Sequence, residues 1–200
     1  MASAALDRSD LRTVTVGGAA VGLITAAAVV AFVLVSRHLA AGPPQRIVES
    51  LIVLAAGVAV SFLPAWWTAA RHTEGIAAAA ATGLVGTVVF MAVDIVLLRP
   101  WQTYPWTWDA IGGGSTWWYL PVWWMLGTFL AWMGGIITAV GAERGEGTVT
   151  RVAITMLGGT ALLVVVARFA GLPFALPVKT GAGFTITLAV LAVVALARKT

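Results

Sequence analysis

The feature that most constrains this chain is a series of six apolar stretches, each about as long as a lipid bilayer is thick. A hydrocarbon core of about 30 Å needs about 20 apolar residues in a helix, because each residue rises about 1.5 Å. Charged residues, prolines and glycines separate the stretches from one another. We predict membrane-spanning helices over residues 13–36, 46–70, 75–98, 117–140, 151–170 and 181–197.

The composition agrees with a membrane protein. Hydrophobic residues make up 60% of the chain and charged residues only 10%, whereas soluble domains carry about 25% charged residues. A disordered chain and an ordinary soluble globule are therefore excluded. The chain has no cysteine, which also excludes thiolate catalysis, iron–sulfur ligation and disulfides.

The apolar stretches favour helices over strands. Strands of a transmembrane barrel alternate apolar and polar residues over about ten positions, whereas these stretches are continuous and rich in Ala, Leu and Val. We expect an all-α fold, a polytopic integral membrane helical bundle of six transmembrane helices in a single domain. Arg8 and Arg12 precede the first stretch, as in a signal peptide, but its apolar part exceeds the roughly 7–15 residues of a signal core. We therefore expect it to be retained as a helix.

Basic residues near the helix ends predict the orientation, because cytoplasmic loops carry an excess of Lys and Arg. This excess favours cytoplasmic termini and places the tryptophan-rich segment 99–116 outside. The net charge of +4 then reflects topology and attraction to anionic lipid, with no nucleic-acid partner. Arg outnumbers Lys in an Ala- and Gly-rich chain, which is compatible with a bacterial inner membrane. The side with the termini carries Arg8, Arg12, Arg71, Arg144, Arg151, Arg198 and Lys199, and the other side Arg37, Arg46, Arg99, Arg168 and Lys179.

Small residues are spaced for close helix packing. Lipid is as apolar as leucine, so transmembrane helices associate where small side chains let their backbones approach. We expect these residues to pack helices within one chain, with a homodimer through one of them as the alternative. They are Gly18 and Gly22 in the first stretch, Gly127, Ala131 and Gly135 in the fourth, and Gly158 and Gly159 in the fifth.

Ten tryptophans are unusual for a chain of 200 residues, and seven of them lie between Trp101 and Trp124. An indole ring prefers the headgroup level of a bilayer, so an aromatic belt accounts for them. The alternative is an aromatic mouth that stacks on a ligand or grips a lipid. The candidates for such a mouth are Trp101, Trp106, Trp108, Trp117 and Trp118.

Asp94 is the charged residue that most needs an explanation, because it lies about four residues inside the end of the third stretch. Helical periodicity places it on a face of small and polar residues with Thr87 and Gly83, so it should point into the bundle. An intramembrane carboxylate is costly and indicates either a structural ion pair or a proton, cation or substrate site. Arg99 is nearest in sequence, although a step of five residues suits an α-helix poorly. Arg37, Arg46 and Arg168 end on the same side.

Glu49 and Arg168 complete the candidate charged set. Glu49 lies near the start of the second stretch, where exposed amides and the helix dipole favour a carboxylate, and it shares a membrane side with Asp94. Arg168 ends the fifth stretch, where a cation is favoured and can snorkel. The predicted ligand, ion or ion-pair site therefore comprises Asp94, Arg99, Glu49, Arg46 and Arg168.

No catalytic or cofactor motif is recognisable in the sequence. His38 and His72 follow the first and second stretches, so they lie on opposite membrane faces, about 30 Å apart, and cannot share a metal or haem. The chain contains no Gly-x-Ser-x-Gly motif, and its Gly112-Gly113-Gly114 run lacks the Gly-Lys-Ser/Thr of a phosphate loop. We therefore expect no cofactor, no metal and no catalytic residue.

Three functions are compatible with these features. We expect a subunit, assembly factor or lipid- or protein-interaction component of a membrane complex, with the bilayer and partner membrane subunits or a second copy as its partners. The alternative is a transporter, or its substrate-binding component, with an outward vestibule lined by Asp94, Glu49, Arg99 and tryptophans. An intramembrane enzyme that modifies a lipid, with Asp94 as base, is the third.

Overall fold

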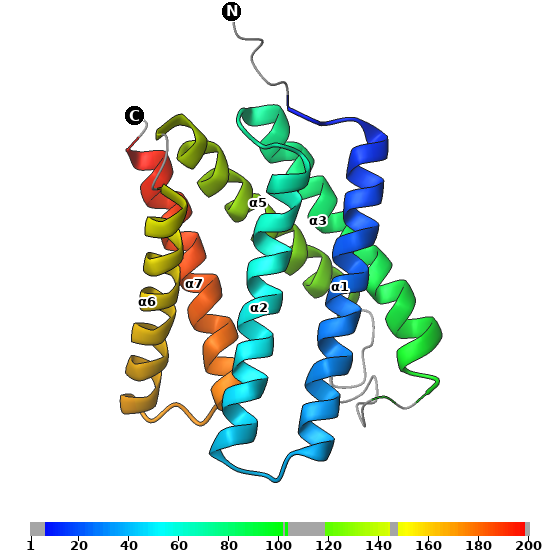
Figure 1. Ribbon diagram of the computed structural model, residues 1–200, viewed down its shortest axis with the longest axis vertical. Helices are drawn as coiled ribbons and strands as arrows, with labels where there is room; N and C mark the ends of the chain where they lie inside the picture. The colour runs from blue at the N-terminus through cyan, green and yellow to red at the C-terminus, as the bar shows by residue number, and fades with distance from the viewer. Residues whose placement is uncertain (1–6, 102, 104–118, 145–147, 199–200) are drawn as a thin grey trace, which may run out of the picture.

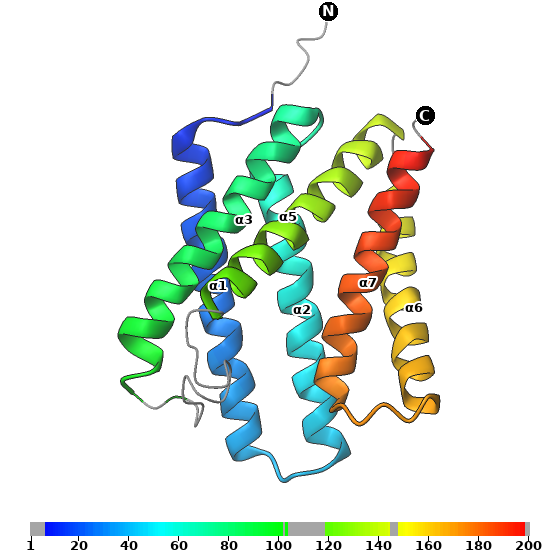
Figure 2. The same cartoon turned by 180° about the vertical axis from the view of Figure 1, so that it is seen from behind.

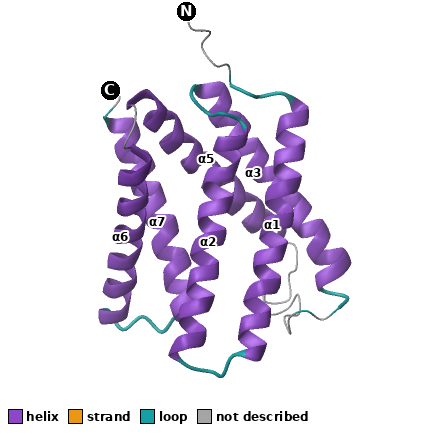
Figure 3. Ribbon diagram, in the orientation of Figure 1, coloured by secondary structure: helices purple, strands orange, loops and turns teal. Residues whose placement is uncertain are grey.

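A computed structural model describes residues 7–101, 103, 119–144 and 148–198. Helices account for all the regular structure of this part of the chain, and none of it is a strand (Figure 3). A short π-helix, η1 (Asp94–Leu98), continues α3 without a break. The long helices are α1 (Leu11–His38), α2 (Pro43–Trp67), α3 (Thr73–Val93), α5 (Tyr119–Arg144), α6 (Thr148–Phe169) and α7 (Leu176–Ala197).

Six helices are long and apolar enough to cross a membrane. They are α1, α2, α3 with η1, α5, α6 and α7, and they correspond in order to the six predicted stretches. Helices suit this environment because each satisfies its own backbone hydrogen bonds, which lipid cannot do. The predicted fold class is confirmed: the protein is an all-α, polytopic membrane bundle of six helices.

The helices run up and down across the bundle, so that the start of α1 and the end of α7 lie at the same end (Figure 1). We call this the terminal end, and it also carries the turn between α2 and α3. We call the opposite end the loop end. It carries the turns that join α1 to α2 and α6 to α7. Seen from behind, α5 crosses the bundle diagonally from α3 toward α7 (Figure 2). α2 contacts α1, α3, α5 and α7, whereas α6 packs mainly against α7.

Prolines set helix starts that differ from the predicted ones. α7 begins at Leu176 rather than at residue 181, because Pro177 occupies the first turn, where its missing N–H has no helical partner to lose. α2 begins at Pro43 rather than at residue 46 for the same reason. The segment 171–180, expected as a connection, is therefore helical over its second half.

The end of α2 also differs from the prediction, which extended the helix to residue 70. The helix ends at Trp67 in a turn where Ala69 has a φ of +50°. The N–H of Ala69 donates to the carbonyl of Trp66 at 3.2 Å, and that of Ala70 to the carbonyl of Ala65 at 2.9 Å. This is the Schellman pattern, in which the left-handed position is usually a glycine. An alanine there costs about 1–2 kcal/mol, which the rest of the fold must offset.

Glycines bring α1, α3 and α5 into close contact, as predicted for packing within one chain. A Cβ at Gly22 of α1 would lie 2.6 Å from the carbonyl oxygen of Gly86 in α3. A Cβ at Gly83 of α3 would overlap Ala131 of α5. Gly159 of α6 faces Thr187 of α7 in the same way. Among the predicted packing residues of α6, Gly158 alone meets nothing within 4 Å and faces outward.

The contact between α2 and α5 provides a test of this packing. A Cβ added at Gly134 of α5 would overlap the backbone carbonyl of Ser61, which is fully buried in α2. Backbone atoms cannot move aside as a flexible side chain can, and overpacking costs about 1–3 kcal/mol. We expect Gly134→Ala to lower the melting temperature in detergent micelles, followed by tryptophan fluorescence.

Gly181→Ala is the matched control, because it adds the same methyl group to a helical glycine of α7 where the Cβ would make only an ordinary contact, 3.4 Å from a methyl group of Val53. Alanine is the better helix former by up to about 1 kcal/mol, so this variant should melt no lower than the wild type. Equal losses in the two variants would contradict close α2–α5 packing at Gly134.

Candidate functional site

The charged residue singled out by the sequence, Asp94, forms a buried ion pair at the loop end of α3. Its carboxylate is fully buried, and its Oδ2 accepts a hydrogen bond from Nε of Arg99 at 2.8 Å. The Arg99 side chain is only 12% exposed. A charge-assisted bond of this length lowers the cost of placing both charges inside the bundle.

A π-turn makes this pairing possible. The backbone N–H of Arg99 donates to the carbonyl of Asp94 at 2.9 Å, five residues back. In an α-helix this step would direct the two side chains apart, which is why the sequence left Arg37, Arg46 and Arg168 open as partners beside Arg99. In η1 the wider turn brings them onto one side. Single π-turns of this kind often occur at functional positions.

Apolar side chains close to Asp94 in the sequence form a buried cluster at this end of α3. Phe90, Met91 and Leu98 are buried together, and Trp123 of α5 packs against them. The rings of Phe90 and Trp123 lie 5.8 Å apart at a tilt of 58°. The full burial of Asp94 strengthens its electrostatic attraction to Arg99.

Glu49 belongs to a second, separate cluster. It was expected near the start of its helix, but α2 begins at Pro43, so Glu49 lies in the second turn and bonds to side chains instead of first-turn amides. Its Oε1 accepts from the hydroxyl of Ser36 at 2.6 Å and from Nε2 of Gln45 at 2.9 Å. Glu49 is buried, and the cluster ties the end of α1 to the start of α2.

The other predicted site residues are not joined to these clusters. Within the residues that the structure describes, Arg46 and Arg168 make no ion pair. Trp101 is 75% exposed. Four of the five tryptophans of the predicted mouth, Trp106, Trp108, Trp117 and Trp118, lie outside the described residues.

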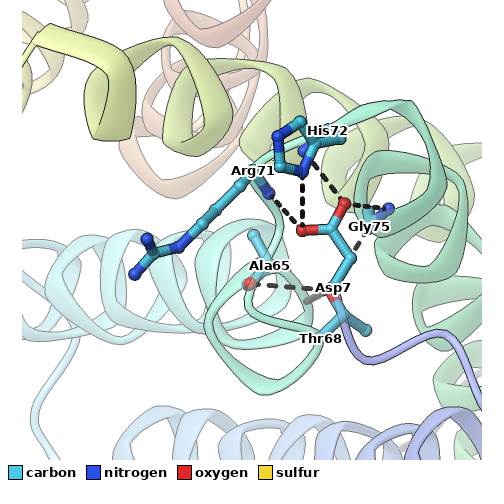
Figure 4. Close-up of polar contacts among 6 residues, drawn as sticks. All are labelled: Asp7, Ala65, Thr68, Arg71, His72 and Gly75. Carbon is cyan, nitrogen blue, oxygen red and sulfur yellow. Dashed lines mark hydrogen bonds and ion pairs between the residues drawn. The ribbon is translucent and has the colours of Figure 1, made fainter. Parts of the chain in front are cut away.

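A third polar cluster, at the terminal end, was missed by the sequence analysis (Figure 4). The carboxylate of Asp7 accepts hydrogen bonds from the backbone N–H groups of Arg71 at 3.0 Å, His72 at 2.9 Å and Gly75 at 2.9 Å. Nδ1 of His72 lies 3.5 Å from Asp7 Oδ1, and the Asp7 side chain is only 3% exposed. Asp7 thus caps the start of α3 from a distant part of the chain.

This cap also holds the turn that contains Ala69. The N–H of Arg8 donates to the carbonyl of Thr68 at 2.8 Å, and the Thr68 hydroxyl donates to the carbonyl of Pro64 at 2.9 Å. The sequence carried one signal for such a cap. The N-cap residue of α3, His72, is not one of the Ser, Thr, Asp or Asn residues that usually cap a helix, so the first-turn amides need an acceptor from elsewhere.

Two opposing effects act on the pKa of Asp7. Partial burial raises it, but the hydrogen bonds from the N–H groups of Gly75, His72 and Arg71, with the nearby His72 ring, lower it by more. The pKa of Asp7 is therefore below its ordinary value of 3.8. The carboxylate is ionised at neutral pH, where it also meets the positive end of the α3 dipole.

The chain matches no protein-family model, no curated protein and no solved structure. The class that the fold defines, a polytopic α-helical membrane protein, therefore rests on the six helices themselves.

The Asp94–Arg99 pair generates a thermodynamic prediction. Asp94→Asn leaves a largely buried guanidinium without its negative partner, and breaking a buried pair from one side costs about 3–5 kcal/mol. We expect both Asp94→Asn and Arg99→Gln to lower the free energy of unfolding strongly. The double variant should lose less than the sum, because it leaves no single buried charge. Strictly additive losses would contradict the pairing.

The Asp7 cap generates a prediction about pH. Because its pKa is lowered on folding, its stabilisation is complete above the ordinary carboxyl pKa and is lost as the pH falls through the folded-state pKa. We expect the melting temperature to fall between about pH 5 and about pH 2, and Asp7→Asn to flatten that part of the profile. Glu74→Gln, a nearby carboxylate in the first turn of α3, is the control and should keep the wild-type slope.

Proposed function

We propose that this protein is a non-catalytic component of a membrane complex and that it binds a transmembrane helix of a partner subunit through the outer face of α6. The observation that carries the proposal is Gly158, a glycine in the middle of α6 with nothing within 4 Å of the position of a Cβ.

α6 is the least covered helix of the bundle. Only 11% of the apolar 18-residue segment of α6 is buried, compared with 56% for the corresponding segment of α5. Large apolar side chains stand exposed along it, among them Ile154, Leu162 and Phe169, the last of which is 87% exposed. Lipid can cover such a face, so exposure alone does not identify a partner.

Contact with lipid does not explain why residue 158 is a glycine. A glycine inside a helix costs about 0.5–1 kcal/mol relative to alanine, and a lipid-facing position offers no contact in return. A partner helix does offer one, because a missing side chain lets two backbones approach closely. The next residue, Gly159, has such a contact with Thr187 of α7. Gly158 also lacks a side chain, but it lies about 100° further around α6, where a Cβ would meet nothing within 4 Å.

The charged groups inside the spans support a structural role over transport or catalysis. Asp94 is held by Arg99, and Glu49 by Ser36 and Gln45. The two carboxylates thus have different partners on different helices. A transport path or a catalytic base would need at least one of them to reach a solute.

The basic residues support a cytoplasmic terminal end in a bacterial inner membrane. Both described ends of the chain lie on that side (Figure 1), together with the larger share of Arg and Lys. The positive-inside rule then places the loop end outside.

The proposal predicts an assembly that one side chain can disrupt. Wild-type protein extracted in mild detergent should have a protein mass larger than the 20.7 kDa of one chain, measured by light scattering after size exclusion. Gly158→Ile places a side chain where the wild type has none, so it should release a folded 20.7 kDa monomer.

Ala153→Ile is the matched control, because Ala153 is an exposed small residue on a different side of the same helix. It should leave the assembly intact. A wild type that is monomeric on extraction, or a Gly158→Ile variant that stays assembled, would refute the proposed function.

A further inference from the structure

An open groove runs between α2, α6 and α7 in the half of the bundle nearest the loop end, where the three helix ends lie together (Figure 1). Its volume is about 370 Å³. Exposed apolar residues form its rims, including Leu51 of α2 and Leu157 of α6. Its floor contains the buried Thr160 and Thr180.

The groove is apolar although three hydroxyl side chains line it. Each hydroxyl donates to a carbonyl of its own helix four residues back. A hydroxyl engaged in this way offers a polar solute little, so the lining fits a hydrocarbon better. The three donors are Ser50 to Arg46 at 2.6 Å, Thr160 to Met156 at 2.7 Å and Thr180 to Leu176 at 3.0 Å.

The groove is short compared with a transmembrane helix. It extends along α2 from Ile47 to Leu54, which is roughly 10 Å at 1.5 Å per residue, whereas a helix that crosses the bilayer is about 30 Å long. A groove of this length fits part of an acyl chain better than a whole transmembrane helix.

Three cations stand at the loop end of the groove. They lie in the first turns of α2 and α7 and in the last turn of α6, and within the described part of the chain none of them makes an ion pair. Each is next to a lining residue: Arg46 beside Ile47, Lys179 beside Thr180, and Arg168 one helical turn after Val164.

Among the described residues no carboxylate lies within ion-pair distance of these cations. Glu49, the carboxylate of α2, instead accepts hydrogen bonds from Ser36 and Gln45 on the side of α1. The helices α2 and α7 both begin here, so the positive ends of their dipoles add to the same potential. The groove therefore combines an apolar channel at membrane depth with three cations at its mouth, where the interface lies.

We propose that this groove binds one anionic phospholipid, with an acyl chain between α2, α6 and α7 and the phosphate among Arg46, Arg168 and Lys179. This inference rests on the proposed role of the protein as an interaction component and deepens it by naming a lipid partner. The groove lies on a different surface of α6 from Gly158, so either proposal can fail while the other holds.

Native mass spectrometry of the purified full chain in detergent tests the proposal. We expect phosphatidylglycerol to bind at least tenfold more tightly than phosphatidylcholine with the same chains. The variant Arg46→Gln/Arg168→Gln/Lys179→Gln should lose this preference, and inorganic phosphate alone should not compete. Ala161→Phe, which adds a ring at an exposed position lining the groove, should weaken the binding of both lipids to the same extent.

The matched control neutralises three cations at the terminal end, Arg12→Gln/Arg71→Gln/Arg198→Gln, and should keep the tenfold preference. Loss of the preference in this control would show a general charge effect and overturn the site. Equal binding of the two lipids by the wild type, or full binding by Ala161→Phe, would overturn it as well. Each of these measurements uses the isolated protein, so it can be interpreted even if the proposed assembly through Gly158 is refuted.

Discussion

Close backbone contact between α1, α3 and α5 is the constraint on which the rest of this structure depends. In lipid there is no hydrophobic drive to bring helices together, so van der Waals contact between closely approaching backbones must hold them. Gly22 against Gly86, and Gly83 against Ala131, provide that contact. The diagonal course of α5 follows from it, because α5 contacts α3 on one side and α7 on the other (Figure 2).

Polar groups stabilise this bundle at its two ends. At the loop end, η1 widens the helix so that Asp94 meets Arg99, and Glu49 joins the end of α1 to the start of α2. At the terminal end, Asp7 supplies acceptors to a turn in which Ala69 has a left-handed backbone. Each cluster has its own partners at one end of the bundle, which favours three separate structural contacts over a shared polar path through the membrane.

α6 differs from the other helices of the bundle in how little of it the rest of the protein covers. α6 leaves most of its surface to the membrane, and its contact with α7 is supplemented by only a slight one with α5. Because α6 is covered so little, it has both features on which the functional proposals rest. These are the outward-facing Gly158 and the groove between α6 and α2. Interaction within the membrane is thus assigned to the part of the protein that its own core covers least.

The sequence by itself determined the number, order and approximate limits of the helices, because hydropathy over a bilayer's length is a local property. It also identified Asp94, Glu49 and the packing glycines as residues needing partners. Only the tertiary structure decided which partners they have. The pairing of Asp94 with Arg99 depends on a π-turn that periodicity cannot predict, and the cap of α3 comes from Asp7, more than sixty residues away. The groove depends on how three helices diverge, which no single stretch of sequence encodes.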